Sequence, residues 1–214
     1  MKKLKLIIFD LDGTLIDAYE AITKSFNFAM KRFGYRRQSR ILIRRAVGWG
    51  DTQLLNAFVP KKDLVGVLET YRRHHLKSLL KYSKVFPGVH RLLADFKAQG
   101  YKLAVASNRP TMFSLLLINH LKLNRYFDYI LCADKLKAGK PHPEILRRIM
   151  DRFSLKPSET LYVGDMIIDA QAGRRARVRT AVVTTGSSSV REIRLEKPWK
   201  IIKRIKDLPK LLLL

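Results

Sequence analysis

Two aspartates at the end of an apolar run are the first residues that could do chemistry. The run Leu4–Phe9 is short and continuous, which is typical of a strand buried on both faces, and Asp10 and Asp12 come directly after it. Side chains at positions i and i+2 of extended chain point the same way, so both carboxylates are expected at the mouth of this strand. Gly13 then allows a sharp turn. Two adjacent carboxylates indicate a metal site or a nucleophile with an acid–base partner, and solvated acids in a turn are the alternative.

Polar residues also follow two later predicted strands. Ser107 and Asn108 stand at the end of the apolar segment YKLAVAS, where a hydroxyl and an amide could hold phosphate oxygens, although this pair is also ordinary turn chemistry. Lys140 is followed by Pro-His-Pro, after the strand predicted over 128–133. A lysine fixed by neighbouring prolines can neutralise a phosphate, and a solvated lysine is the alternative.

A second pair of aspartates follows the strand predicted over Thr160–Gly164. Asp165 comes directly after this strand, and Asp169 lies four residues later, within one helical turn, so both side chains can face the same site. Carboxylate oxygens are the ligands that Mg²⁺ prefers. Asp169 could instead only cap the helix that it begins.

Strands and helices alternate along most of the chain, which predicts an α/β fold with a doubly wound parallel sheet. In such a sheet ligands bind outside the carboxyl ends of the strands, so the four polar clusters are expected to meet at one edge. The predicted strands are 4–9, 101–107, 128–133, 160–164, 180–184 and 199–202, and the predicted helices between them are 89–99, 111–121, 143–153 and 169–176.

A long helical stretch interrupts this alternation after the first strand. Apolar residues recur at helical spacing over 21–33, 41–47, 52–58 and 63–80, with glycines and a proline between the segments. We therefore expect two domains, an α/β core made of residues 1–16 and 84–214, and a helical cap made of residues 17–83.

The composition bounds the class of protein. Apolar residues make up 47% of the 214 residues, which is ordinary for a globular protein, and the single cysteine, Cys132, lies in an apolar segment and is expected to be buried and inert. No apolar run approaches the ~20 residues of a spanning helix, so no membrane partner is expected and the protein is predicted to be cytoplasmic.

The formal net charge of +25 is unusual. Such a charge is typical of proteins that bind nucleic acid, anionic membranes or anionic metabolites. Here the basic residues are spread along the chain, which favours a solvated basic surface over a dedicated nucleic-acid site. Nucleic acid remains a partner that is not favoured, and the high charge points to a monomer or a dimer.

The polar clusters together resemble the motifs of the haloacid-dehalogenase superfamily of phosphohydrolases, over nearly the whole chain. The branch that includes phosphoglycolate phosphatases is the most similar, and its fold is an α/β core with an inserted helical cap. The matching residues are Asp10–Thr14 for the first motif, Ser107 for the second, Lys140 for the third and Gly164-Asp165-x-x-x-Asp169 for the fourth. Arg109 stands where lysine is common in this branch.

The resemblance implies a role for each carboxylate. Asp10 is the nucleophile that forms an aspartyl-phosphate, and Asp12 protonates the leaving oxygen and then activates water. Mg²⁺ is bound by Asp10, by the backbone carbonyl of Asp12 and by Asp165, while Asp169 binds it through water or orients Asp165. The dehalogenases of the family lack the second aspartate, so Asp12 indicates phosphate ester chemistry.

The resemblance also implies how the substrate is held. Ser107 and Lys140 bind the phosphoryl oxygens, with help from backbone amides near Leu11 and Asn108. The cap closes over the core and supplies substrate contacts. Its best candidates are Gly48 and Trp49 in the loop Gly-Trp-Gly, and Arg44 and Arg45 before it, which could meet a second acidic group on the substrate. Trp49 could instead pack within the cap.

These observations predict an Mg²⁺-dependent phosphatase that acts on a small phosphorylated metabolite. Phosphoglycolate, pyrophosphate, sugar phosphates and nucleotides all remain open as substrates. Two alternatives also remain: a phosphotransferase similar to phosphoglucomutases, and a basic nucleic-acid-binding protein on the same fold. The complete set of Asp10, Asp12, Lys140 and Asp165 argues against the last.

Overall fold

Six parallel strands form the central sheet of the computed structural model, which describes residues 3–212. The order of the strands across the sheet is β5-β4-β1-β6-β7-β8. Residues 1–2 and 213–214, at the ends of the predicted core domain, lie outside the description. The strands are β1 (Leu6–Phe9), β4 (Lys102–Ser107), β5 (Tyr129–Cys132), β6 (Thr160–Gly164), β7 (Arg179–Val183) and β8 (Lys200–Ile202).

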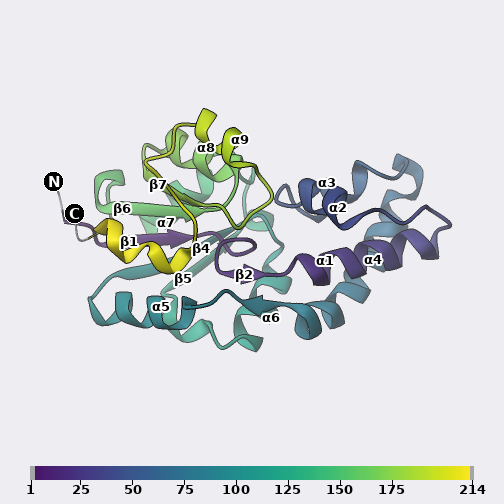
Figure 1. Cartoon of the computed structure of the whole chain (residues 1–214), viewed down its shortest axis with the longest axis horizontal. Coiled ribbons are helices and arrows are strands. Elements are labelled where there is room, and N and C mark those ends of the chain that lie inside the picture. Colours follow the sequence, from purple (N-terminus) through teal and green to yellow (C-terminus); the bar gives the residue numbers. More distant parts are fainter. Residues whose placement is uncertain (1–2, 213–214) are drawn as a thin grey trace.

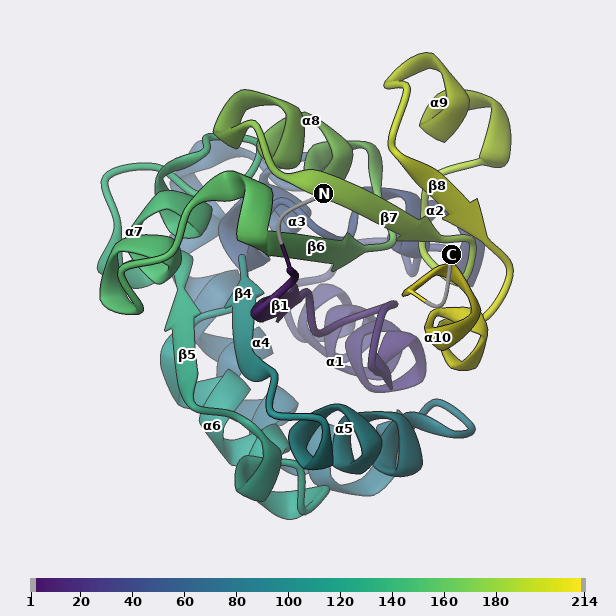
Figure 2. The ribbon, with the colours of Figure 1, turned by 90° about the vertical axis from the view of Figure 1, so that its left-hand side faces the viewer.

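Helices cover both faces of this sheet, and alternate side chains of each strand pack against opposite layers (Figure 2). Ile7 and Phe9 pack on the face of α5 (Val89–Ala98) and α6 (Thr111–His120). Leu6 and Ile8 pack on the other face, against α7 (Glu144–Arg152) and α8 (Ile167–Ala176). All four residues of β1 are fully buried, which is why this strand reads as an uninterrupted apolar run. The short helices α9 (Val190–Leu195) and α10 (Pro209–Leu212) complete the core.

Four helices form an insertion between the first two segments of the core. They are α1 (Tyr19–Arg32), α2 (Arg40–Ala46), α3 (Asp51–Asn56) and α4 (Lys61–Tyr82), and we call them the helical insertion. α1 and α4 run side by side away from the sheet (Figure 1), and Phe26, Met30 and Val67 are fully buried in the insertion's apolar interior.

The helical insertion leaves and rejoins the core through two very short strands. β2 (Ile16–Asp17) and β3 (Lys84–Val85) pair antiparallel, with Ile16 opposite Val85 and Asp17 opposite Lys84. These strands were not predicted, because two residues are too few to carry a periodic pattern. The other predicted strands and helices are confirmed, with ends that shift by one or two residues in most cases.

The order of the strands fixes where a ligand is expected. β1 lies between β4 and β6, so successive crossovers leave it in opposite directions, and such a switch point opens a crevice at the carboxyl ends of the strands. Those ends face the helical insertion (Figure 1). The confirmed α/β fold thus brings the four polar clusters of the sequence to the junction between the sheet and the insertion.

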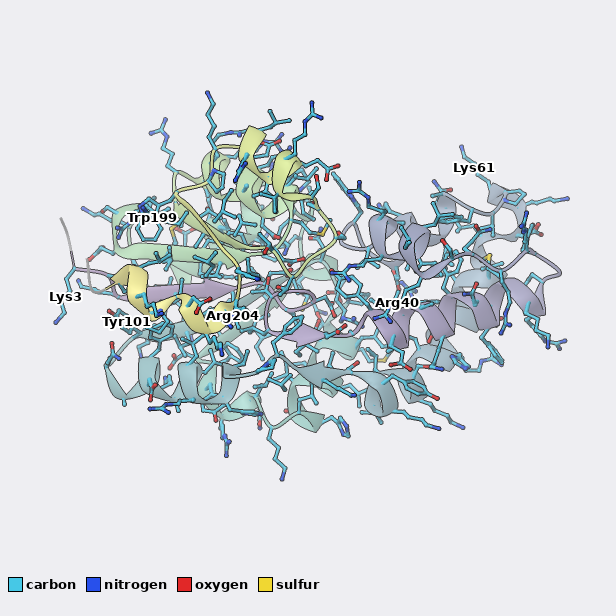
Figure 3. The ribbon with its side chains drawn as sticks, viewed as in Figure 1. Lys3, Arg40, Lys61, Tyr101, Trp199 and Arg204 are labelled. Carbon is cyan, nitrogen blue, oxygen red and sulfur yellow. The ribbon has the colours of Figure 1, made fainter. Side chains whose placement is uncertain are left out.

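Basic side chains project from both parts of the molecule. Lys3 lies at the end of the core that is far from the insertion, Arg204 lies nearer the middle of the core, and Lys61 projects from the insertion itself (Figure 3). The positive charge is therefore distributed over the surface. Within residues 3–212, none of the helices is both long and apolar enough to cross a membrane.

Candidate active site

Asp10 occupies the centre of the site because β1 ends in the middle of the sheet. Its backbone N–H donates to the carbonyl of Val163 at 2.8 Å, which continues the pairing of β1 with β6 by one residue. Its carboxylate lies 2.7 Å from the Nζ of Lys140. Burial raises the pKa of Asp10 to about 6, against the lowering effect of Lys140, so the surroundings favour a cation beside this carboxylate.

Lys140 is held in place from both ends. Its backbone N–H donates to Asn108 Oδ1 at 2.8 Å, and its ammonium donates to Asp169 Oδ1 at 2.9 Å and to the hydroxyl of Tyr162 at 3.1 Å. Burial lowers the pKa of Lys140, but Asp10 and Asp169 outweigh it and the net pKa is raised. The ammonium therefore stays charged at the floor of the site.

Asp169 both caps its helix and reaches the site. Its Oδ2 accepts hydrogen bonds from the backbone N–H groups of Asp165 at 3.0 Å and Met166 at 2.9 Å, at the N-terminus of α8. Its Oδ1 accepts from Lys140 and from Tyr162, at 2.9 and 2.6 Å. Each oxygen of Asp169 thus already has two donors, so this carboxylate orients its neighbours.

The two carboxylate oxygens of Asp165 have different surroundings. Asp165 is fully buried, and its Oδ1 accepts from the hydroxyl of Thr14 at 2.9 Å. Among the described residues, its Oδ2 has no hydrogen-bond partner, an arrangement that costs about 1–3 kcal/mol in a buried site. Burial, followed by Asp10 and Asp169, raises the pKa of Asp165 well above its usual range.

Two glycines keep space open beside this free oxygen. A Cβ on Gly13 would lie 2.3 Å from Asp165 Oδ2, and a Cβ on Gly186 would lie 1.9 Å from it. Gly13 has a φ of 85°, which also favours glycine. Asp10, Asp165 and Asp169 offer oxygens that all lie within 4.8 Å of one another. The free oxygen, the cradle and the donor set fit a hard divalent cation.

Asp12 lies beside Asp10 but has a different partner. Both of its oxygens accept from the guanidinium of Arg109, from Nη2 at 2.7 Å and from Nε at 2.8 Å. Arg109 Nη1 lies 2.9 Å from Nε2 of His75, a residue of α4 in the helical insertion. Because arginine only donates, His75 Nε2 must accept, and its Nδ1–H can then donate to Ser25 Oγ at 3.1 Å. Burial, Arg109 and His74 hold the pKa of His75 well below its usual range, so the ring is neutral.

Asp10, Asp12, His75, Arg109 and Lys140 line a cavity of about 60 Å³ between the sheet and the helical insertion. Its cationic lining residues are Lys140 and Arg109, and its acidic ones are Asp10, Asp12 and Asp51. Asp51 is paired with Arg72 at 2.7 Å. The remaining wall is mainly apolar and includes Ile22, Val47, Leu54, Tyr71, Phe113, Met166 and Ile168. The volume suits a small ligand.

A family model described as haloacid dehalogenase-like hydrolase matches residues 7–183. The chain is a haloacid dehalogenase-like hydrolase. This match confirms the predicted family and the prediction that the protein is a hydrolase.

Curated and solved relatives of this hydrolase cover nearly the whole chain. A phosphoglycolate phosphatase from Aquifex aeolicus is 30% identical over 204 residues, which is 94% of this chain and 96% of the relative. Phosphoglycolate phosphatase 1 from Pseudomonas aeruginosa is 32% identical over 217 residues, 95% of this chain and 78% of the relative. The crystal structure of a predicted phosphoglycolate phosphatase from Haemophilus somnus has a TM-score of 0.92 at 27% identity and covers 99% of both chains.

The second-motif residues of this hydrolase lie beside the cavity. Ser107 is buried, and its Oγ accepts from the backbone N–H of Arg109 at 3.1 Å. The side chain of Asn108 donates to the carbonyls of Gly48 and Lys140, both at 2.9 Å. Its amide thus joins the insertion to the loop that carries Lys140, which leaves its backbone N–H as the group available to a phosphate.

The predicted substrate contacts of the insertion separate into two groups. Gly48 lines the cavity, whereas Trp49 is 42% exposed and is not among the lining residues. Arg44 Nη2 donates to the carbonyls of Thr185 and Gly186 at 2.8 and 2.9 Å. Arg45 Nη1 lies 2.9 Å from Glu192 Oε2. In this arrangement Arg44 holds the insertion against the loop after β7, and Arg45 holds it against α9.

Besides Arg109, three residues of the site had no role assigned from the sequence. Thr14 belongs to the first motif, and its hydroxyl could have been assigned from that position. Tyr162 lies inside a buried strand, and His75 lies inside a helix, so each reads as a packing residue. Only the tertiary contacts of Tyr162 with Asp169 and of His75 with Arg109 reveal them.

A basic groove lies on the helical insertion, apart from the cavity. It is formed by α1, α4 and Arg37, and none of its lining residues is acidic. Two aromatic rings in it, Phe28 and His74, stack at 4.2 Å. Its basic lining residues are Lys24, Lys31, Arg32, Arg37, Lys77 and Lys81. Nucleic acid stays an untested alternative partner for this hydrolase, and this groove is the surface on which to test it.

Proposed function

We propose that this hydrolase is an Mg²⁺-dependent phosphatase that cleaves a small phosphate monoester through an aspartyl-phosphate on Asp10. The observation that carries the proposal is that Asp10 lies 2.7 Å from a buried charged lysine and close to Asp165, whose Oδ2 has no hydrogen-bond partner among the described residues. A structural ion pair alone would not need a second buried carboxylate with a free oxygen. A phosphoryl-transfer site does, because it must hold a cation beside its nucleophile.

Asp10 and Asp165 would bind the metal directly, together with the backbone carbonyl of Asp12. Asp169 is the weaker candidate for a direct ligand, because both of its oxygens already accept two hydrogen bonds. It would therefore act by orienting Lys140 and the backbone of Asp165. When bound, Mg²⁺ offsets the repulsion between a carboxylate and a phosphate and stabilises charge on the transferred group.

The residues of the chain then divide the reaction into two displacements. In the first, an oxygen of Asp10 bonds to phosphorus, the bond from phosphorus to the leaving oxygen breaks, and Asp12 gives that oxygen a proton. In the second, Asp12 takes a proton from a water that attacks phosphorus, and the bond to Asp10 breaks. The products are an alcohol and inorganic phosphate, and Asp12 regains its proton. Such proton transfer typically contributes about 10²–10⁴-fold.

Lys140 and Ser107 would hold the phosphoryl oxygens during both displacements, with the backbone N–H groups of Leu11 and Asn108. Lys140 is suited to this because its charge is fixed by two carboxylates and its position by three hydrogen bonds from its ammonium and backbone. Groups placed before the reaction do not have to reorganise during it.

Phosphoglycolate is the substrate that we propose to test first. The curated relatives from Aquifex aeolicus and Pseudomonas aeruginosa are both named phosphoglycolate phosphatases, and the cavity of about 60 Å³ favours a small leaving group.

The test measures phosphate release from 2-phosphoglycolate with Mg²⁺, with EDTA, and by the variant Asp10→Asn. We expect Mg²⁺-dependent turnover that EDTA removes and that Asp10→Asn lowers by roughly 10⁴-fold or more, as expected for loss of a nucleophile. Asp95→Asn, at an exposed position of α5, is the matched control and should retain full activity. Turnover that survives Asp10→Asn would overturn the proposal.

A further inference from the structure

Arg109 is a buried arginine that the catalytic scheme above does not use. Only 9% of its surface is exposed, and its guanidinium lines the cavity between Asp12 and His75. Its contacts with these two residues use three of the five N–H groups of a guanidinium. Burying such a group is costly unless its charge is matched, and here the match is Asp12.

The pairing of Arg109 with Asp12 conflicts with the proposed role of Asp12 in proton transfer. A bidentate fork fixes the plane of the carboxylate and engages both of its oxygens. For Asp12 to turn one oxygen toward the leaving oxygen of a substrate, at least one of these bonds must loosen. Arg109 would then be a buried cation without its full set of acceptors, unless another anion enters the cavity.

The position of Arg109 shows where that anion would lie. If phosphorus sits at Asp10 and the leaving oxygen at Asp12, then the substituent on the leaving oxygen extends beyond Asp12, toward Arg109. Lys140 is the other cation of the cavity lining, and it is already on the phosphoryl side, 2.7 Å from Asp10. A second negative group on the substrate therefore has one matching partner in the lining.

His75 fixes this partner without competing with the substrate. It is neutral and accepts a single hydrogen bond from Arg109, and it comes from the helical insertion, whereas Arg109 and Asp12 belong to the core. The guanidinium is thus held at this place when the insertion is closed. A neutral acceptor leaves the charge of Arg109 available to a carboxylate.

We propose that Arg109 is a specificity residue that exchanges Asp12 for a carboxylate of the substrate. The exchange keeps two charge-assisted hydrogen bonds on the guanidinium and frees Asp12 to face the leaving oxygen. The ligand class is a phosphate ester of a small hydroxy acid, with the carboxylate one carbon from the ester oxygen. This inference rests on the proposed phosphatase function and adds to it the means by which the enzyme distinguishes its substrate.

The test compares two phosphate esters of nearly equal size, 2-phosphoglycolate and ethyl phosphate, in which a methyl group replaces the carboxylate. We expect the wild-type kcat/KM to favour 2-phosphoglycolate by roughly 10²-fold or more, since a site with a buried polar group rejects the analogue that leaves it unpaired. In Arg109→Met this ratio should fall at least tenfold, with changes in both KM and kcat on 2-phosphoglycolate. Arg109→Lys should keep part of the preference. Arg91→Met, at an exposed position of α5, is the matched control.

His75→Phe supplies a second variant that leaves no buried charge unpaired, in case Arg109→Met fails to fold. It removes the acceptor of Arg109 Nη1 and should lower the preference for 2-phosphoglycolate severalfold. Equal losses on both esters in these variants would overturn the inference, because Arg109 would then only support Asp12. If wild-type protein hydrolyses neither ester nor other phosphate monoesters, the proposed function itself fails, which is a different result from loss of the preference.

Discussion

The two walls of the cavity are built in different ways. On the core side, Asp10, Lys140 and Asp165 come from the ends of buried strands or from loops, Asp169 comes from the first turn of α8, and their hydrogen bonds interlock. On the insertion side, the contacts with the core combine apolar packing, such as that of the His75 ring on Phe113, with single hydrogen bonds. Arg44 donates to two backbone carbonyls, Gly48 accepts from one side chain, and the His75 ring accepts from one guanidinium.

From this difference we expect the core side to carry out the reaction and the insertion side to control the entry of substrate. The core side is fixed by the sheet and stores unfavourable electrostatics, visible in the raised pKa values of Asp10 and Asp165, which a bound cation would relieve. If the insertion opens to admit substrate, its hydrogen bonds to the core must break. We therefore expect changes on the core side to abolish turnover, and changes on the insertion side to alter the apparent affinity.

Among the changes that test this comparison, removal of the charge of Asp165 has the largest expected effect. Asp165→Asn should lower kcat/KM by roughly 10²-fold or more, because even groups that only orient a metal ligand are worth up to that factor. The same change should raise the free energy of unfolding of the metal-free protein by about 1–2 kcal/mol, since a buried unpaired charge is removed. The sign follows from the raised pKa of Asp165, which means that folding disfavours its ionised form at neutral pH.

Urea unfolding in EDTA, combined with phosphate release, checks both parts of this prediction. Asp95→Asn should change neither quantity. A variant that is less stable than wild type without metal would mean that Asp165 supports the fold and is not a strained ligand.

The variant Gly186→Ala tests the same oxygen of Asp165 by filling the space beside it, without changing a charge. The added Cβ would lie 1.9 Å from Asp165 Oδ2, so the carboxylate must move. A shift of about 1 Å in a reacting group can cost ~10²-fold, and we expect Gly186→Ala to lose about that much in kcat. The neighbouring change Ser187→Ala is the control, because the Ser187 hydroxyl has no hydrogen-bond partner among residues 3–212. Equal activity of the two variants would show that the space beside Asp165 is not needed.

The variants Arg44→Ala and Arg45→Ala test the contacts between the insertion and the core. Arg44→Ala removes two hydrogen bonds to the core loop and a contact with the ring of Tyr19, so kcat/KM on 2-phosphoglycolate should fall roughly tenfold, mainly through KM. Arg45 forms an exposed ion pair with Glu192, so Arg45→Ala should change kcat/KM by less than about twofold. If Arg44→Ala instead lowered kcat alone, Arg44 would act on the reaction and not on closure.

The smallest expected effect is the dependence of stability on pH that His75 contributes. The pKa of His75 is well below 6.5 in the folded protein, so as pH falls below about 6.5 the unfolded chain gains a proton that the folded protein cannot accept. Between pH 6.5 and 5.5 this should cost wild type about 1 kcal/mol of unfolding free energy relative to His75→Gln. The titratable groups that face His75, namely Arg109, His74 and Tyr71, are present in both proteins. Parallel pH profiles of the two proteins would contradict the assignment of a neutral His75.

The sequence was informative wherever one local rule determines the structure. Buried strands such as Leu6–Phe9 read as apolar runs, and polar residues after them had to converge once the sheet was parallel. The short strands β2 and β3 carry no such pattern, and neither does the contact of His75 with Arg109, because that contact joins a helix to a distant loop. The binding of Arg44 to the carbonyls of Thr185 and Gly186 depends on how the insertion sits on the core, which no local pattern encodes.

The pairing of β2 with β3 has a consequence for how such a protein diversifies. The chain leaves the core at Asp17 and returns at Lys84, and these two residues face each other across the same short ladder. Any segment inserted between them therefore starts and ends at the same place on the core. The helical insertion can therefore be lengthened, reshaped or replaced in related proteins without moving a strand of the sheet. The catalytic residues can then stay the same while the preferred substrate changes.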